Sequence, residues 1–382
     1  MPEYRKNLGL AELVSFGVGG TIGSGIFIVP AIAAGLAGPG SLLAWLIVAV
    51  SASCVMLSLA WASSKYPSTG AFYSIFSKVF SKRLSTTVVL FYVIASVFGV
   101  ATIAAGIGQY ISFFGYTDVL WLEIAIVVMF GTINIIGVRP SGKVEILLTI
   151  LKTLPLIVLS IILVPYIQKD NFIPFFTASK TDFLKAVIIV YWPFTGFEIS
   201  AIPADETKNK KDVFTSLVIV ILITTIVYLF LNIALIGSVG SQLLASSPAP
   251  LALAASQVIH NSGKAMAVIG IIAMLSALNA YLLAASRVLQ NVSFENMLPL
   301  LPDISKRGTP YAAIIISTIA GASLLLFSNQ FQYLATISVI ATLLPYIFLC
   351  ACAIKLFDSL KIRIVAGIGL VSTLAILLTS FL

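Results

Sequence analysis

Residues 8–36 read LGLAELVSFGVGGTIGSGIFIVPAIAAGL, and this stretch decides the fold class. As one helix its 29 residues would extend about 44 Å, longer than the ~30 Å hydrocarbon core of a bilayer. Five of the nine residues from Gly17 to Gly25 are glycine, and each costs about 1 kcal/mol relative to alanine inside a helix. One interpretation is close helix packing through small residues. The other is a helix that breaks at Thr21–Gly25, because irregular backbone at membrane depth survives where it lines a cavity or is buried in protein.

The composition places the whole chain in a membrane. Of its 382 residues, 59% are hydrophobic and 9% are charged, whereas soluble domains carry about 25% charged residues. Disorder is excluded as well, since it requires low hydrophobicity. Apolar stretches of about 20 residues, the length that crosses a bilayer as a helix, predict a single all-α transmembrane domain over residues 1–382. We count eleven spans, at 8–36, 40–63, 85–112, 120–138, 143–166, 183–203, 213–239, 264–292, 310–328, 331–354 and 362–382.

Basic residues predict the orientation of these spans. With the N-terminus in the cytoplasm, 17 of the 22 Lys and Arg residues fall on the cytoplasmic side and Lys152 lies inside a span, while Lys169, Lys180, Lys185 and Lys264 fall outside. The formal charge of +8 is therefore a topology signal, and no nucleic-acid partner is expected. We expect a multi-pass protein of the cell membrane, in contact with the bilayer, with its C-terminus outside. Between the second and third spans, KYPSTGAFYSIFSKVFSKR (65–83) predicts an amphipathic helix lying on the membrane surface.

Cysteine and histidine usage gives no indication of an enzyme. Cys54, Cys350 and Cys352 lie inside apolar stretches without a CxxC pair, and we interpret them as small lipid-facing or core-facing residues. The one histidine, His260, lies in a polar connection and is expected to be solvated. No nucleophile–base pair and no metal-ligand set can be assembled from these residues. We therefore expect no enzymatic activity, no cofactor and no metal.

A second interrupted span lies at 183–203, where the sequence AVIIVYWPFTGFEISAIPADETKNK covers residues 186–210. Pro193 removes a backbone donor, and Gly196 weakens the helix three residues later. Interrupted helices at corresponding positions of two halves are the best sequence indication of a transporter site. Spans one to five and six to ten form such halves, over approximately 8–166 and 183–354, with 362–382 as an extra span. Because each half has an odd number of spans, the second enters from the opposite face and the repeat is inverted.

The ends of the broken helices predict the chemistry of the site. The outer half of the first span begins after its break, so the amides of Ser24, Gly25 and Ile26 present a partial positive charge that suits a carboxylate. The inner half ends near Thr21, and the outer half of the sixth span ends near 192–195. Both ends leave unpaired carbonyls, which suit an ammonium group.

A carboxylate and an ammonium a few ångströms apart describe the backbone of an amino acid. Trp192 and Phe194, beside the second break, are expected to cover the side chain of the bound molecule.

Two ionisable residues lie deep in predicted spans. Glu198 follows the second break, and Lys152 lies about ten residues into the fifth span, or ~15 Å from its start. One interpretation is a static Lys152–Glu198 ion pair that locks helices together. The other is functional, since ionisable residues at this depth are expensive and mark ion or substrate paths. In that interpretation Lys152 places a cation where a sodium ion would otherwise sit, and either residue could carry a proton.

At this point the chain resembles the amino acid–polyamine–organocation (APC) superfamily of transporters, within the LeuT-like fold of broken first and sixth helices. The resemblance spans roughly residues 8–354 and rests on five motifs in order. These are GTIGSGIF (20–27), YPSTGAFYSIFSKVF (66–80), NIIGVRPSGKVEILLTILK (134–152), FTGFE…DETKN (194–209), and SRVLQN…ENMLP with KRGTP (286–310).

The resemblance implies roles for individual residues. Lys152 is similar to the helix-five lysine that occupies the second sodium site in sodium-independent members, and Glu198 to a helix-six glutamate tied to coupling in some members. Trp192 takes the position of the family's gating aromatic residue. The substrate-binding residues that we predict from both arguments are Thr21, Ile22, Gly23, Ser24, Gly25, Trp192, Phe194, Thr195 and Gly196.

The leading hypothesis is a sodium-independent secondary transporter of amino acids, either a proton symporter or an exchanger, that works by alternating access. A polyamine or organic-cation carrier is an alternative. Such a substrate would need further carboxylates in the pocket, and Glu198 is the one carboxylate that lies deep in a predicted span. An amino-acid-sensing receptor on the same fold is another alternative. A channel is disfavoured, because it would need a continuous polar lining that these spans lack. Which amino acid is carried, the direction of transport, and whether the protein is a monomer or a homodimer stay open. Candidates for side-chain selection, whose facing is undecided, are Tyr92, Ser96, Asn279 and Tyr281.

Overall fold

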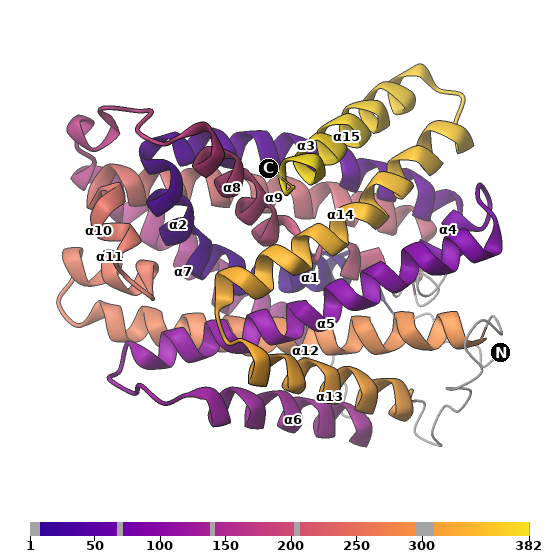
Figure 1. The fold of residues 1–382 in the computed structure, drawn as a ribbon, viewed down its shortest axis with the longest axis horizontal. Coiled ribbons are helices and arrows are strands. Elements are labelled where there is room, and N and C mark those ends of the chain that lie inside the picture. The colour runs from indigo at the N-terminus through magenta and orange to yellow at the C-terminus, as the bar shows by residue number, and fades with distance from the viewer. Residues whose placement is uncertain (1–7, 67–71, 138–141, 202–206, 295–308, 382) are drawn as a thin grey trace.

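The computed structural model describes residues 8–66, 72–137, 142–201, 207–294 and 309–381, and the regular elements of this part of the chain are all helices, without a strand (Figure 1). The motif pieces 67–71, 138–141, 202–206 and 295–308, and the predicted span ends at 138, 203 and 382, lie outside the described residues. One isolated pairing, between Leu8 and Thr207, ties the start of the described chain to the segment before α9. The elements are α1 (Leu10–Thr21), α2 (Ser24–Ala37), η1 (Gly38–Gly40), α3 (Ser41–Lys65), α4 (Phe72–Phe76), α5 (Lys82–Ser112), α6 (Leu120–Ile136), α7 (Gly142–Leu163), η2 (Val164–Tyr166), η3 (Lys169–Phe172), α8 (Lys180–Tyr191), η4 (Trp192–Phe194), η5 (Phe197–Ala201), α9 (Lys210–Val239), α10 (Ser241–Ala245), α11 (Pro250–Val258), α12 (Ser262–Phe294), α13 (Tyr311–Phe327), α14 (Phe331–Leu356) and α15 (Leu360–Thr379), where η marks a short 3-10 helix.

The prediction of an all-α polytopic membrane protein is confirmed. Within the described residues, eight helical stretches are long and apolar enough to cross a membrane, and the first, Leu10–Lys65, contains two of the predicted spans. The apolar helices α6 and α13 are shorter. All eleven predicted ranges fall on helical segments, while the number of crossings and the inverted repeat stay predictions.

The long helices pack as a bundle around the first and sixth predicted spans. Figure 1 shows α5 and α12 side by side, with α14 crossing α5 and the pair α6–α13 at one edge. α2 packs against α8, and α1 packs against η5 and α9. The interruptions between α1 and α2, and after α8, therefore lie in the interior of the bundle.

Apolar side chains cover much of the outer surface. Leu147 and Ile161 on α7, Ile319 on α13 and Val371 on α15 are each more than half exposed. Soluble monomers rarely expose such broad apolar faces, so this surface fits a bilayer rather than water. His260 is exposed in the turn before α12, and the cysteines are free and buried in helix contacts.

The prediction of a helix lying on the membrane surface after the second span is wrong for the described part of that segment. α4 is a five-residue helix, and Phe72, Tyr73, Ile75 and Phe76 on it are buried. Packing against α5 and α14 buries these aromatic residues at the end of the bundle.

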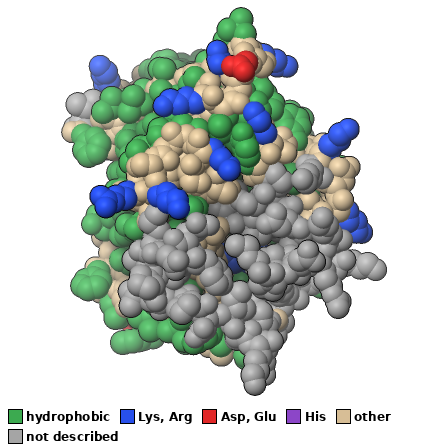
Figure 2. All heavy atoms as spheres, turned by 90° about the vertical axis from the view of Figure 1, so that its right-hand side faces the viewer, with side chains coloured by type: hydrophobic (Ala, Val, Ile, Leu, Met, Phe, Trp, Pro, Cys, Tyr) green, Lys and Arg blue, Asp and Glu red, His purple; other side chains and the backbone are tan. Residues whose placement is uncertain are grey.

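The described basic residues gather at the end of the bundle where α3 and α14 finish and α5 and α15 begin. Figure 2 shows Lys and Arg side chains spread over this end. Fewer lie toward the other end, where η3, α8 and α12 contribute Lys169, Lys180, Lys185 and Lys264. The residues that gather are Lys65, Lys78, Lys82, Arg83, Lys355, Lys361 and Arg363.

Candidate functional site between two broken helices

The first predicted span is two helices joined by two non-helical residues. α1 ends at Thr21 and α2 begins at Ser24, with Ile22 at φ −81°, ψ 91° and Gly23 at φ −142°, ψ −145°. Glycine loses the most freedom in a helix, so the run of glycines favours an interruption here. The break lies inside the predicted Thr21–Gly25 segment.

The sixth predicted span is interrupted as well. α8 ends at Tyr191, the 3-10 turn η4 follows, and Thr195 is extended at φ −80°, ψ 162°. Gly196 has φ +92°, a left-handed conformation that side chains disfavour, and η5 starts directly after it. Pro193, which cannot donate to the α-helical ladder, lies in η4.

The two breaks touch each other through their backbones. A Cβ atom built on Gly20 would lie 2.9 Å from the carbonyl oxygen of Gly196, and one on Gly25 would lie 2.5 Å from Pro193 Cα. A Cβ on Gly196 would lie 2.6 Å from the carbonyl oxygen of Gly20. Since non-bonded carbons prefer about 3.5–4.0 Å, glycine is required on both sides of this contact.

The N-terminus of α2 lies at this contact, since Gly25 in its first turn packs against Pro193. Its N-cap is Gly23, which has no side chain with which to cap them. The first amides of a helix have no partner within the helix and carry a partial positive charge. The start of α2 therefore offers amides without helical partners at the place where a carboxylate site is predicted.

Protein hydroxyls bind the carbonyls on the other side of the breaks. The Thr21 carbonyl accepts a hydrogen bond of 2.9 Å from the Tyr228 hydroxyl on α9. The Trp192 carbonyl accepts one of 2.7 Å from the Thr195 hydroxyl, which also lies 2.9 Å from the Tyr281 hydroxyl on α12. In this conformation, hydroxyl groups stand where the ammonium group is expected.

The two aromatic residues of η4 face different neighbours. The Trp192 indole nitrogen donates to the Ser24 hydroxyl at 3.2 Å, so this ring bridges the two breaks. Its centroid lies 5.7 Å from that of Tyr281. The Phe194 ring packs instead against Trp45 and Tyr228, with centroids at 6.0 and 5.3 Å. The Trp192 side chain thus contacts the first break, whereas Phe194 packs against α3 and α9. All nine predicted binding residues are buried.

Lys152, on α7, is 1% exposed and faces the inner half of the first span. Its ammonium group donates to the Gly19 carbonyl on α1 and to the Ser276 hydroxyl on α12, the latter at 3.3 Å. One turn earlier on α7, Thr149 donates to the Ser15 carbonyl at 3.1 Å. Lys152 thus places a cation at the C-terminal half of α1.

Glu198 is 3% exposed and has other partners than Lys152. One carboxylate oxygen accepts from the Tyr92 hydroxyl at 3.0 Å; the other accepts from the Tyr346 hydroxyl at 2.8 Å and from the Gly196 amide at 3.1 Å. The carboxylate thereby fastens the second break to α5 and α14. These bonds do not support the interpretation of a static Lys152–Glu198 pair.

Several residues at the site were missed by sequence reasoning or had no predicted facing. Tyr228, Tyr346 and Ser276 were missed, although a hydroxyl in an apolar span needs a partner and so is itself a signal. Of the four undecided candidates, Tyr281 and Tyr92 reach the second break. Ser96 bonds the carbonyl of its own helix, and Asn279 accepts from Asn134.

A second carboxylate is buried away from the breaks. Glu123, in the first turn of α6, is 2% exposed and packs against Gly108 of α5. Its Oε2 atom has no hydrogen-bond partner among the described residues. Sequence reasoning identified two ionisable residues deep in the spans, Glu198 and Lys152, and did not predict the burial of Glu123.

Comparison with known proteins identifies the family of the chain. The amino acid permease family matches residues 8–382. The chain is 26% identical over 388 aligned positions to the inner membrane transport protein YbaT of Escherichia coli K12. This alignment covers 98% of this chain and 88% of that protein. It is 23% identical to the branched-chain amino acid permease BcaP of Bacillus subtilis, over 81% of this chain and 72% of that protein. It is 26% identical to the serine/threonine exchanger SteT of Bacillus subtilis, over 90% of this chain and 81% of that protein. The chain therefore belongs to the amino acid permease family of the APC superfamily.

Proposed function

We propose that this permease is a secondary transporter of neutral amino acids that holds its substrate between the two breaks. The amides of Ser24, Gly25 and Ile26 bind the substrate carboxylate, and the carbonyls of Thr21, Trp192 and Thr195 bind its ammonium group. The observation that carries the proposal is the backbone contact of Gly20 with Gly196 and of Gly25 with Pro193. It brings a helix N-terminus and opposing carbonyls within reach of one small zwitterion.

Access to the site requires that the present hydroxyl bonds open. Three bonds close it, Trp192 to Ser24, Tyr281 to Thr195, and Tyr228 to the Thr21 carbonyl. A substrate ammonium replaces the hydroxyls at these carbonyls and a substrate carboxylate competes for Ser24. Substrate binding is thus coupled to movement of the helices that carry these side chains.

A pocket of about 620 Å³ is the entrance that we propose on the outer side. It is lined by Ile28 and Ile32 of α2, by Gln109 of α5, and by residues of α10, α14 and the segment after α10. Ile28 lies one turn beyond Ser24, so the pocket leads toward the start of α2. Among the described residues its lining has amide and hydroxyl groups and no charged side chain, which suits a substrate without a charged side chain.

The same reasoning disfavours a polyamine carrier. Such a substrate needs a carboxylate that is free to bind it, but both oxygens of Glu198 accept hydrogen bonds from the protein. The printed names of two relatives, a branched-chain amino acid permease and a serine/threonine exchanger, agree with neutral substrates.

For coupling, we propose that Lys152 replaces a sodium ion. Its ammonium group binds the Gly19 carbonyl and Ser276, oxygen ligands of the kind that a sodium ion prefers. Transport is then independent of sodium, and is driven by protons or by exchange for a second amino acid. The substrate is moved without chemical change.

The proposed setting is the cell membrane with the N-terminus in the cytoplasm. The gathering of described Lys and Arg at one end of the bundle supports it, because cytoplasmic loops carry an excess of these residues.

Uptake by reconstituted proteoliposomes tests the proposal. A panel of labelled neutral, cationic and anionic amino acids and a polyamine is offered under an inward proton gradient, a sodium gradient, no gradient, or with amino acid preloaded inside. We expect accumulation of neutral amino acids with protons or preloading, and no effect of sodium. Sodium-driven uptake would overturn the role of Lys152. Preference for a polyamine would overturn the substrate class, and saturable binding without uptake would favour a receptor.

A further inference from the structure

Three lysines from distant parts of the chain meet at the basic end of the bundle. Lys65 ends α3, Lys78 lies between α4 and α5, and Lys355 lies in the last turn of α14. The side chains of all three are exposed. Figure 2 views the molecule from this end, and Lys and Arg side chains are spread over the described part of that face.

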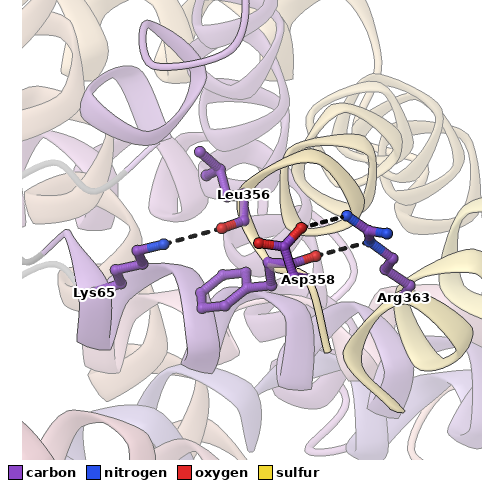
Figure 3. A network of polar contacts seen from close by, with 5 residues as sticks. Lys65, Leu356, Asp358 and Arg363 are labelled. Carbon is purple, nitrogen blue, oxygen red and sulfur yellow. Dashed lines mark hydrogen bonds and ion pairs between the residues drawn. The ribbon is translucent and has the colours of Figure 1, made fainter. Parts of the chain in front are cut away.

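Each of the three ammonium groups lies over an aromatic ring, and that of Lys65 also donates to a carbonyl. Lys65 Nζ donates to the Leu356 carbonyl at 3.0 Å and lies 4.8 Å from the ring centroid of Phe357 (Figure 3). Lys65 and Lys78 share the ring of Tyr66, at 5.6 and 5.9 Å. Lys355 lies 5.3 Å from the ring of Phe80. Cation–π contacts of this length keep the lysines in place without neutralising them.

Carboxylates do not balance this charge in the described structure. Asp358 follows α14 nearby, but its carboxylate binds Arg363 with an N–O distance of 2.7 Å (Figure 3). None of the three lysines forms an ion pair with a described residue. The aromatic contacts thus keep three positive charges in this region, and no described carboxylate offsets the repulsion between them. An anion from outside the protein removes this repulsion.

The surroundings indicate which anion. The cluster lies at the end of the bundle where α3 and α14 finish, and exposed apolar side chains lie on the helices that begin at this end. Leu360 and Ile364 at the start of α15 are 72% and 53% exposed, and Leu84 at the start of α5 is 40% exposed. A ligand that satisfies both surfaces has a phosphate at the lysines and an apolar chain along the helices, as a membrane phospholipid does.

We propose that Lys65, Lys78 and Lys355 form a binding site for the headgroup phosphate of an anionic phospholipid. Clusters of Lys and Arg beside membrane helices attract anionic lipids. The lipid joins the end of α3, the start of α5 and the α14–α15 hairpin, and so stabilises the packing of α15 on the bundle. The site is separate from the substrate site and does not depend on the proposed function.

Thermal unfolding in a non-ionic detergent tests the site. Phosphatidylglycerol, phosphatidylcholine with the same acyl chains, or inorganic phosphate is added to the full chain. We expect phosphatidylglycerol to raise the midpoint by about 5 °C at saturation, with smaller effects of the other two. The variant K65Q/K78Q/K355Q is expected to lose this increment, measured from its own midpoint without lipid.

Two further variants separate the site from general effects of charge and folding. K169Q/K180Q/K264Q removes the same charge toward the other end of the bundle and should keep the full increment. K78Q/K355Q preserves the bond from Lys65 to Leu356, so it reports on the site even if the triple variant folds poorly, and should lose most of the increment. An equal response to phosphatidylcholine or inorganic phosphate, or an unchanged response of both lysine variants, would overturn the proposal.

Discussion

Replacing Gly25 by alanine adds one methyl group at the point where the broken helices touch. The new Cβ would lie 2.5 Å from Pro193 Cα, 2.9 Å from Pro193 N and 3.0 Å from Pro193 Cβ. Carbon atoms prefer contacts of about 3.5–4.0 Å, so α2 and η4 must separate by about 1 Å. The obstructing atoms belong to the backbone and ring of a proline, which cannot rotate away as a flexible side chain does.

The size of the effect follows from this overlap. An extra methyl group in a packed interior costs about 1–3 kcal/mol. If the strain opposes the substrate-binding arrangement of the breaks, this corresponds to a dissociation constant that is larger by about 5- to 150-fold. We expect the unfolding midpoint to fall as well, because the same contact stabilises the bundle.

Binding of a labelled neutral amino acid to the purified protein, together with thermal unfolding, measures both effects. Gly367→Ala is the matched control, since Gly367 also lies in a membrane helix, α15, and a Cβ there meets nothing within 4 Å. That change should leave binding as it is, and alanine favours the helix by about 1 kcal/mol. Wild-type affinity and midpoint for Gly25→Ala would refute the contact, as would equal damage from both variants.

Three other changes probe the same site. Gly196→Ala places a side chain at φ +92° and 2.6 Å from the Gly20 carbonyl oxygen, so we expect a loss of at least about 1–2 kcal/mol, seen as a lower unfolding midpoint. A midpoint like that of the wild type would contradict this. Lys152→Met should abolish the response of uptake to an imposed pH gradient, and a full response would make Lys152 purely structural. Tyr281→Phe removes the 2.9 Å contact with the Thr195 hydroxyl and keeps the ring, so KM for uptake should rise about 2- to 10-fold. An unchanged KM would place this hydroxyl outside the binding step.

The breaks could be predicted from sequence because their causes are local. Glycine and proline weaken a helix through their own backbone properties. The run from Gly17 to Gly25 and the pair Pro193–Gly196 therefore predict where the helices are interrupted. Helix-end charges then follow from the break itself. The length of the apolar stretches likewise predicted the positions of the long helices in the described structure.

Contacts between distant helices could not be predicted in the same way. Which face of α5, α9, α12 or α14 turns inward depends on packing, so nothing in the sequence pairs Tyr346 or Tyr92 with Glu198. The burial of Glu123 depends on Gly108 of another helix for the same reason. The segment of α4 was predicted to lie on the membrane surface because its sequence combines apolar and basic residues as an amphipathic helix does. Its burial depends on packing against α5 and α14, which the sequence does not show.

The most direct test of the central claim is an experimental structure with a transported amino acid bound. We expect its carboxylate within hydrogen-bonding distance of the Ser24 and Gly25 amides, its ammonium group at the carbonyls of Trp192 and Thr195, and the bond from Trp192 to Ser24 broken or shifted. An amino acid bound elsewhere, with Gly20 and Gly25 still in contact with Gly196 and Pro193, would contradict the account.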